Sequence, residues 1–535
     1  MRQGSIKNLM RCNYNLLLFV VLLTSESLLA ANRETSAYLG PDGKLHYKVL
    51  AKGDRIVDFS YAGYMAGGVA LPKIPSVKTI QPTGDDDTAA IQSALDELAR
   101  ETTETHPVAL VLAPGTFHLG GALYIRASGL VLRGSGSGER GTTLQLTGNP
   151  HPAVIATARN DHAEDSTKEA SEKAASIGDP TTLTNSYVPS GSTTITVQSA
   201  KHLHAGETIL IVRPITPAWL AFMGMDKLIR NGRPETWIKG VLTTERIIAS
   251  VDGNLLHLAV PLTDSYDPVY GGGSATQVFA IQRPNRLHQV AVEDLHIIAP
   301  ELHINLGQPH YDGIAFHAVE DGWVRNLQID EATNAVDIGA DSRRITVEDI
   351  HYLQRVPIEG AAKPFVFSIA GTQVLVQRVS GIADNTWYYA TQARTQGPNV
   401  ILKGVFHGNG HIQPHQRWST GLLIDNCEVL DGGIDLQSRG EMGSGHGWPI
   451  GWGVIWNSRA GSFVVQSPPG TANWSIGNQG PEDLAPMPVF DQQPKEPPLL
   501  QGIIESPNHP VSPISLYVQQ LGERLGHQAV KNTGN

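Results

Sequence analysis

The chain has 535 residues, of which 41% are hydrophobic and 17% are charged, a composition typical of a folded globular protein rather than a disordered one. The formal net charge is −11 and no long basic run occurs, which argues against a nucleic-acid partner. The length allows one large domain or two or three ordinary ones.

The first part of the chain, residues 1–31, has the pattern of a secretory signal peptide. A basic start precedes an apolar run at 15–23 that is too short to span a bilayer, and Ala30 and Ala31 offer a cleavage site. An uncleaved anchor is the alternative. Cleavage would leave Cys427 as the single cysteine, so no internal disulfide is expected. We therefore expect a secreted or periplasmic protein with no membrane segment in its mature form.

A capped helix and several short strands are expected next. The segment "GDDDTAAIQSALDELAR" at 84–100 places acidic residues and a threonine where the first backbone N–H groups lack partners. Ile91, Leu95 and Leu98 then form one apolar stripe. Short strands follow, separated by a Pro-Gly turn and by glycine-rich corners.

This opening resembles the amino-terminal part of the pectate lyase superfamily, of the pectate lyase 3 type. The shared features are an acidic stretch leading into an Ala-Ala-Ile-Gln helix at 84–92, a Pro-Gly-Thr-Phe turn at 114–117, and an apolar strand ending in Gly-x-Gly at 130–136. The resemblance implies an all-β fold, a right-handed parallel β-helix of the pectin lyase kind with a short N-terminal capping helix. It does not specify a reaction.

From residue 290 onward, segments of alternating apolar residues recur at intervals of about 20 to 30 residues, which is typical of stacked coils. Because one coil cannot bury its inner face alone, several must stack. We therefore expect 324–330 and 347–353 to be adjacent parallel strands. The six segments that share the pattern are 292–298, 324–330, 347–353, 376–382, 402–408 and 424–430.

The expected organisation is a signal peptide followed by one solenoid. An irregular, loop-rich region at 150–285 is expected to be an elaboration inserted into the fold rather than a separate domain. The C-terminal tail is rich in proline and ends in an amphipathic helix that could close an end of the stack. The predicted parts are the signal peptide 1–31, an N-terminal extension 32–79, the β-helix 80–480 and the tail 481–535.

The stretch "HGNGHIQPHQRW" at 407–418 places three histidines four residues apart. This spacing would suit a metal only on a helix, and the glycines and the proline within the stretch argue against a helix. No metal site is therefore expected. His407 ends an apolar segment and is expected to have a packing role.

Aligning the repeats places Asn385 over His411 and Tyr389 over His415, and it brings titratable groups to one corner of the stack. An ordinary solvated turn is the alternative interpretation of this corner. The candidate catalytic residues are His415, Arg417, His411, Asp384, Arg355 and Tyr389. The candidate substrate contacts are Trp418 and Trp448 in polar loops, Glu331 one coil away, and His310 with Asp312 in a second cluster.

With the family resemblance, this corner predicts a secreted lyase that cleaves a uronic-acid polysaccharide by β-elimination. One of the two arginines would neutralise the substrate carboxylate, one of the histidines would take the α-proton, and Tyr388 or Tyr389 would protonate the leaving oxygen. No cofactor is required. Calcium could replace the arginine, as it does in many pectate lyases, although no triple-aspartate cluster is evident.

Two other functions stay open. A glycoside hydrolase on the same scaffold needs two carboxylates about 5–9.5 Å apart. Asp384 with Glu331, or Asp337 with Asp341, could form such a pair, although the adjacent double aspartate of β-helix polygalacturonases is not found in the coil region. A non-enzymatic glycan-binding or adhesin module is the third hypothesis, because a fold does not dictate a function. The sequence names neither the polymer nor the oligomeric state.

Overall fold

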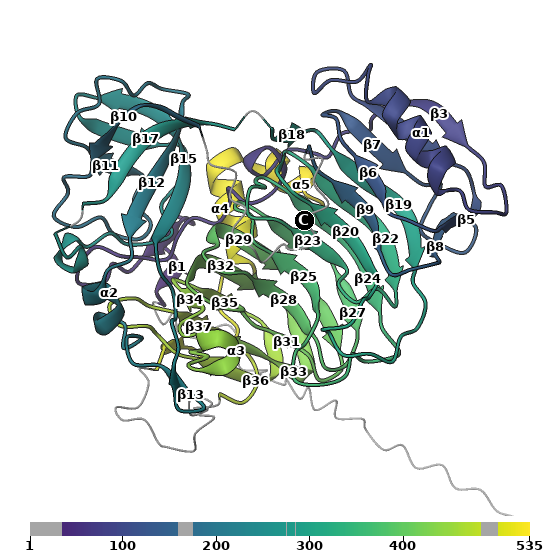
Figure 1. The fold of residues 1–535 in the computed structure, drawn as a ribbon. Helices are drawn as coiled ribbons and strands as arrows, with labels where there is room; N and C mark the ends of the chain where they lie inside the picture. The colour runs from purple at the N-terminus through teal and green to yellow at the C-terminus, as the bar shows by residue number, and fades with distance from the viewer. Residues whose placement is uncertain (1–34, 159–174, 274, 284, 483–500) are drawn as a thin grey trace, which may run out of the picture. The chain divides into compact units, whose positions relative to one another are not determined.

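The computed structural model describes residues 35–158, 175–273, 275–283, 285–482 and 501–535. The predicted signal peptide lies outside these ranges. Among the residues described, no helix is long and apolar enough to cross a membrane. The main body is a right-handed parallel β-helix in which successive coils stack their strands in three columns, here called A, B and C (Figure 1).

Column A runs the whole length of the stack. Three of its strands, β19, β22 and β24, are long and continue into column B. The strands of column A are β3 (Ser76–Ile80), β4 (Val108–Leu112), β7 (Leu130–Arg133), the first halves of β19 (Ala291–Ile298), β22 (Trp323–Asp330) and β24 (Thr346–Leu353), then β26 (Leu375–Gln377), β29 (Gln396–Leu402), β32 (Ser419–Asp425), β35 (Val454–Trp456), β37 (Trp474–Ile476) and β38 (Ile503–Glu505).

Columns B and C complete each coil. Column B contains β5 (Gly115–Leu119), β8 (Thr142–Leu146), the second halves of β19, β22 and β24, β27 (Ser380–Ile382), β30 (Val405–His407) and the first parts of β33 (Glu428–Leu436) and β36 (Arg459–Val465). Column C contains β6 (Leu123–Ile125), β9 (Pro152–Ala156), β20 (Asp312–Phe316), β23 (Val336–Ile338), β25 (Phe365–Ile369), β28 (Trp387–Thr391), β31 (His411–Ile412) and the later parts of β33 and β36.

The six repeated segments stack as predicted, with one shift of register. Val324 pairs with Val347 in adjacent parallel strands, and Val347 pairs with Val376, which confirms the predicted neighbours. Val376 then pairs with Ile401 rather than with Leu402, so the fifth segment begins one residue earlier than predicted.

The interior of the helix is filled by the inward residues of all three columns. The core side chains of successive coils, such as Leu327 and Ile350, are fully buried and lie over one another. Helix α1 (Thr88–Leu98) adds Ile91 and Leu95 to the same core. The helix expected within 84–100 is therefore present and packs against the first coils, although its N-cap residue Asp87 makes no side-chain capping hydrogen bond.

The outer side of column A is also covered by protein. The N-terminal segment and the helices α4 (Leu516–Leu525) and α5 (His527–Asn532) pack on outward tryptophans of column A, including Trp452 and Trp456. The carboxylate of Asp425 accepts hydrogen bonds from the Ser515 hydroxyl at 2.7 Å and the Tyr517 N–H at 2.9 Å at the start of α4. The C-terminal helix thus lies along the side of column A rather than over an end of the stack.

A second, antiparallel sheet is inserted between β9 and β19. Its six strands have the order β10-β17-β12-β15-β16-β11 and enclose a separate apolar core. A short helix, α2 (Pro217–Phe222), follows the third of these strands in the chain. The strands are β10 (Ala175–Thr182), β11 (Thr194–Thr196), β12 (Thr208–Pro214), β15 (Val241–Asp252), β16 (Leu255–Leu258) and β17 (Gln277–Gln282).

A buried network of ion pairs between arginines and glutamates connects this insert to the β-helix. Glu245 of the insert accepts hydrogen bonds from Arg286 at 2.9 Å and from Arg343 of the β-helix at 2.8 Å. Glu320 of the β-helix accepts from Arg286 at 2.9 Å, from Arg343 at 2.6 Å and from Arg344. Burial alone would raise the pKa of both carboxyls, but the surrounding arginines lower each pKa to about 2.

We expect Glu320→Gln to lower the free energy of unfolding by about 3–5 kcal/mol, because the substitution leaves buried arginine charges without their partner. The folded-state pKa lies below the ordinary value of 4.5, so the stabilisation is present above that pH and is lost as the pH falls toward 2. Denaturant unfolding at several pH values measures both effects.

The matched control is Glu428→Gln, whose ion pair with Arg459 is half-exposed and 3.5 Å long. This exposed pair should contribute at most about 1 kcal/mol. Equal destabilisation by the two substitutions would show that the buried network does not hold the insert.

Candidate functional site

The outer face of column C carries a line of polar side chains. In β23 the flanking Val336 and Ile338 point into the core, so Asp337 points outward. Asp337 pairs with Ser368 on β25, and Ser368 pairs with Ala390 on β28.

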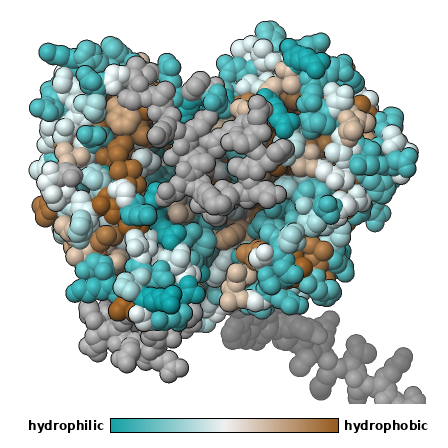
Figure 2. All heavy atoms as spheres, in the orientation of Figure 1, coloured by the Kyte–Doolittle hydropathy of each residue, from teal (hydrophilic) through white to brown (hydrophobic). Residues whose placement is uncertain are grey.

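Farther along the face, Trp387 of β28 pairs with His411 of β31, and His411 pairs with Gly433 of β33, two residues before Asp435. These strands lie side by side in Figure 1. Most of the coloured residues on the side of the molecule seen in Figure 2 are hydrophilic.

Trp387 is the aromatic centre of this face. The Lys363 Nζ lies 4.9 Å from the centroid of its ring and the Arg439 guanidinium lies 5.1 Å from it, distances at which a ring attracts a cation. Burial lowers the pKa of Lys363, and the nearby Arg439 lowers it further. Burial also lowers the pKa of Arg439 to about 10, so this guanidinium keeps its charge at neutral pH. The indole ring therefore holds two cations together.

His411 lies beside Trp387, its pairing partner on the neighbouring strand. Its Nδ1 is 2.7 Å from Oδ2 of Asp435, which also accepts a hydrogen bond from the Gln413 amide at 3.1 Å. A carboxylate only accepts, so Nδ1 of His411 carries a proton, and in the neutral ring Nε2 presents a lone pair. The ring is partly exposed whereas Asp435 is 2% exposed. This arrangement orients His411 as a proton acceptor.

His415 lies on the same face but in a different environment. Its Nδ1 donates to the Gln392 amide oxygen at 2.8 Å, and its ring packs 5.0 Å from Phe365 and 4.8 Å from His446. Burial, with the charges of Arg439 and Arg417 in addition, lowers the pKa of His415 to about 3. The imidazole is neutral at physiological pH and is a far weaker base than an ordinary histidine.

Arg417 connects two other parts of the chain instead of facing the open surface. Its Nε donates to the Trp237 carbonyl of the insert at 2.8 Å, and its Nη2 donates to the Ser444 hydroxyl at 2.7 Å. Arg417 therefore fastens the insert to the loop that follows β33.

The other charged candidates lie in turns that follow column B. Arg355 pairs with Glu331 at 3.1 Å, and Asp384 accepts a hydrogen bond from the Asn409 N–H at 2.9 Å. These contacts shape the turns and are separate from the His411–Asp435 pair. His407, expected to pack, is exposed at the end of β30.

The register around β31 differs from the predicted one, and Tyr389 faces the core as a result. Trp387, not Asn385, pairs with His411, and Tyr389 pairs with Ile412 rather than with His415. Tyr389 is 0% exposed, and its hydroxyl has no hydrogen-bond partner within the described ranges. Because Tyr389 is buried, its hydroxyl cannot reach a substrate on the face. Burial also raises the pKa of Tyr389, which makes it a weaker acid.

Trp418 and Trp448, expected as sugar contacts, are 1% and 2% exposed. They pack with Trp219 and Trp237 of the insert, and the Trp418 indole N–H donates to Asp264 at 2.9 Å. Neither ring has a face open to a ligand. Their place in the structure corrects the expectation, because the insert covers loops that look exposed in the sequence.

His310 and Asp312 lie at the other end of the column C face. Asp312 accepts a hydrogen bond from the Asn334 amide at 2.8 Å, and His310 lies 3.7 Å away from it. Burial raises the pKa of Asp312 and of Asp337. Four strand spacings separate Asp337 from Asp435, which is about 19 Å. The second cluster is therefore far from the His411–Asp435 pair.

One group of potential metal ligands stands out in the part of the chain described, formed by His288, Glu320 and Asp321. It does not fit a cation, because Glu320 and Asp321 both pair with Arg344 and Glu320 also pairs with two further arginines. These carboxylates already neutralise the arginines of the buried ion network.

The functional side chains that the sequence did not indicate are Lys363, Trp387, Asp435, Gln413 and Arg439. They lie on or beside the short strands of column C, between the repeated segments. The distance from each repeated segment to the next strand of column C varies, and β31 has only two residues, so no sequence period marks these positions.

No family model matches the chain, and no curated protein matches it. The A-module of the mannuronan C-5 epimerase AlgE6 of Azotobacter vinelandii is similar in structure, with 11% identity, a TM-score of 0.33, and 79% of this chain and 73% of that chain covered. The tailspike gp61 of the Pseudomonas phage phi297 is similar at 12% identity and a TM-score of 0.29, with 79% and 73% covered.

A third similar structure is the tailspike protein of the E. coli bacteriophage HK620, in complex with a pentasaccharide. It shares 10% identity at a TM-score of 0.38, with 84% of this chain covered, and the match spans 61% of the tailspike chain. At such identities the likeness concerns the fold alone.

The environment of His415 predicts that its ring does not titrate in the physiological range. With a pKa of about 3, the imidazole should stay neutral, with its proton on Nδ1, from pH 5 to pH 8. Nitrogen-15 NMR of the histidine rings across this range measures both properties, and a His415→Asn spectrum assigns the signal. A His415 midpoint above pH 5 would contradict the described environment.

Proposed function

We propose that this chain is a polysaccharide lyase that cleaves a uronic-acid-containing polymer by β-elimination on the outer face of column C. The observation that carries the proposal is one constellation, in which Trp387 holds Lys363 and Arg439 beside the His411–Asp435 pair. The proposal keeps the reaction expected from the pectate lyase resemblance and one of its two expected bases, His411, and assigns the other roles to different residues.

The two cations support a carboxylate ligand. Lys363 and Arg439 repel each other, and their attraction to the Trp387 ring keeps them together at a partly open face. A substrate carboxylate between them would relieve this repulsion. Neutralising the carboxylate makes the α-proton more acidic, which is the first requirement of β-elimination.

His411 supplies the base. Asp435 holds the Nδ1 proton, so Nε2 is free to take the α-proton of the uronate. The electron pair of that C–H bond becomes a carbon–carbon double bond, and the bond from the β-carbon to the glycosidic oxygen breaks. The Lys363 ammonium, whose pKa is lowered by burial, would protonate the leaving oxygen in place of the buried Tyr389.

The hydrolase alternative keeps one candidate pair of carboxylates, Asp312 and Asp337 on neighbouring strands, where the charge of Asp337 adds to the raised pKa of Asp312. Asp337 and Asp435 are about 19 Å apart along the face, whereas a glycosidase pair is separated by about 5–9.5 Å. The two pairs considered from the sequence are both engaged elsewhere, since Glu331 pairs with Arg355 and the side chain of Asp341 pairs with Arg283 of the insert.

The proposal includes export of the protein, which is what brings such an enzyme to an extracellular polymer. In the native host, the mature chain should begin at Ala31 or Asn32 and lie outside the cytoplasm. Amino-terminal sequencing of the fractionated protein tests this, and an intact Met1 on a cytoplasmic protein would contradict it.

The reaction is tested with a panel of uronate polymers, recording both the ultraviolet absorbance of unsaturated sugars and the release of reducing ends. We expect both signals to rise. His411→Ala should lower turnover by at least about 100-fold, since one general base contributes about 10²–10⁴-fold. Asp435→Asn should also lower turnover, because it weakens the hold on the His411 proton.

His407→Ala is the matched control, since this histidine is exposed on a neighbouring strand of column B and should leave turnover unchanged. Full activity of His411→Ala would contradict the assignment of the base. Reducing ends without absorbance would identify a hydrolase, and neither signal would favour a binding module.

A further inference from the structure

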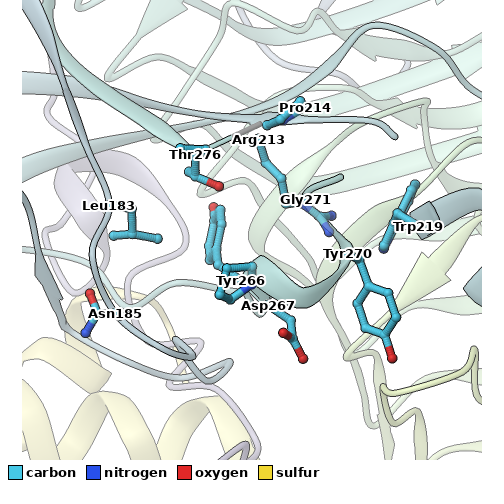
Figure 3. Close-up of a pocket in the computed structure, with 12 residues that line it drawn as sticks. Leu183, Asn185, Arg213, Pro214, Trp219, Tyr266, Asp267, Tyr270, Gly271 and Thr276 are labelled. Carbon is cyan, nitrogen blue, oxygen red and sulfur yellow. The ribbon is translucent and has the colours of Figure 1, made fainter. Parts of the chain in front are cut away.

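The inserted region contains a cavity that takes no part in the proposed reaction. Figure 3 shows Leu183 and Asn185 on one side of it, Arg213, Trp219 and Tyr270 on the other, and Tyr266 between them. A neighbouring hollow shares Arg213, Trp219 and Tyr270. The residues that line the cavity belong to the insert and are distinct from those around Trp387.

The charges in the walls of this cavity are neutralised in place. Arg213 pairs with Asp264 at 2.7 Å, and its guanidinium lies 4.7 Å from the Trp219 ring centroid. At the rim, Lys52 pairs with Asp267 at 2.7 Å. Two cations therefore meet two carboxylates. An anionic ligand would be repelled by both carboxylates and would find no unpaired cation to bind. Around Trp387, by contrast, two cations lie near one ring.

The aromatic walls are held in place by stacking. The Tyr270 ring is stacked on Phe222 with centroids 4.0 Å apart, and Trp219 is stacked on Trp237 with centroids 5.0 Å apart. Tyr270 is only half-buried, so part of its ring borders the cavity. These rings form a rigid, amphipathic wall that needs no rearrangement when a ligand binds.

The cavity also has a fixed polar group facing the aromatic wall. The Asn185 amide oxygen accepts the Thr196 N–H at 2.7 Å, which sets the orientation of the amide and leaves its NH2 group as a donor. Aromatic walls combined with a few positioned polar groups are the usual composition of a small-molecule site.

We propose that this cavity is a second glycan site, which binds one uncharged sugar unit in contact with its aromatic residues and with Asn185. The C–H face of a sugar ring packs on an aromatic ring, and its hydroxyls match the Asn185 donor and the paired Arg213–Asp264 group, which can donate and accept at once. The net neutrality of the walls selects an uncharged sugar over a uronate. The site is independent of the reaction proposed for column C.

Binding is tested by calorimetry on the full-length mature protein, with maltohexaose, mannohexaose and galactohexaose as neutral probes and oligogalacturonate as the anionic probe. We expect one neutral probe to bind, and Tyr270→Ala and Asn185→Ala each to weaken that binding at least tenfold. The tryptophan fluorescence should change on binding, because Trp219 borders the cavity.

Two comparisons separate this site from the reaction on column C. Trp387→Ala should leave binding of the neutral probe unchanged, and Tyr270→Ala should leave turnover of uronate polymers unchanged. Tyr38→Ala, a half-buried tyrosine outside the cavity, controls for loss of an aromatic side chain. The proposal is overturned if no neutral probe binds at millimolar concentration, if binding survives both cavity substitutions, or if oligogalacturonate occupies the cavity more tightly.

Discussion

The rest of the structure depends on the register of the parallel strands from coil to coil. A coil buries its inner face only against its neighbours, so the apolar positions must lie over one another, as Val324, Val347 and Val376 do. A slip of one residue would turn a whole row of side chains from the inside to the outside. The same register therefore places Trp387, His411 and Gly433 side by side on neighbouring strands and builds the candidate site.

Coverage by other parts of the chain then decides which outward face can meet a ligand. Column A is covered by the N-terminal segment and by α4 and α5, and the insert is clasped beside the β-helix through Glu245 and Glu320. Column C keeps Trp387 and His411 partly exposed. The buried ion network fixes the position of the insert. The insert includes Trp237, whose carbonyl accepts a hydrogen bond from Arg417 next to the column C face.

The sequence was informative where one side of a strand is buried and the other is not. The long strands β22 and β24 alternate clearly, and their pairing was predicted. In β29 every residue is buried, since column A is covered on its outer side as well, so alternation gave no register and the fifth repeat was placed one residue too late.

The strands of column C were missed for another reason. β31 has only two residues, which is too short to show a period, and so the partnership of His411 with Asp435 could not be read from the sequence. The burial of Trp418 depends on an insert far away in the chain, which no local pattern reports.

Binding of a uronate at the face around Trp387 can be seen directly in a crystal structure of the His411→Ala variant with a uronate oligosaccharide. We expect a sugar carboxylate between Lys363 and Arg439, with the α-carbon facing the place of the missing imidazole. An oligosaccharide bound elsewhere on the chain, with the column C face empty, would contradict it.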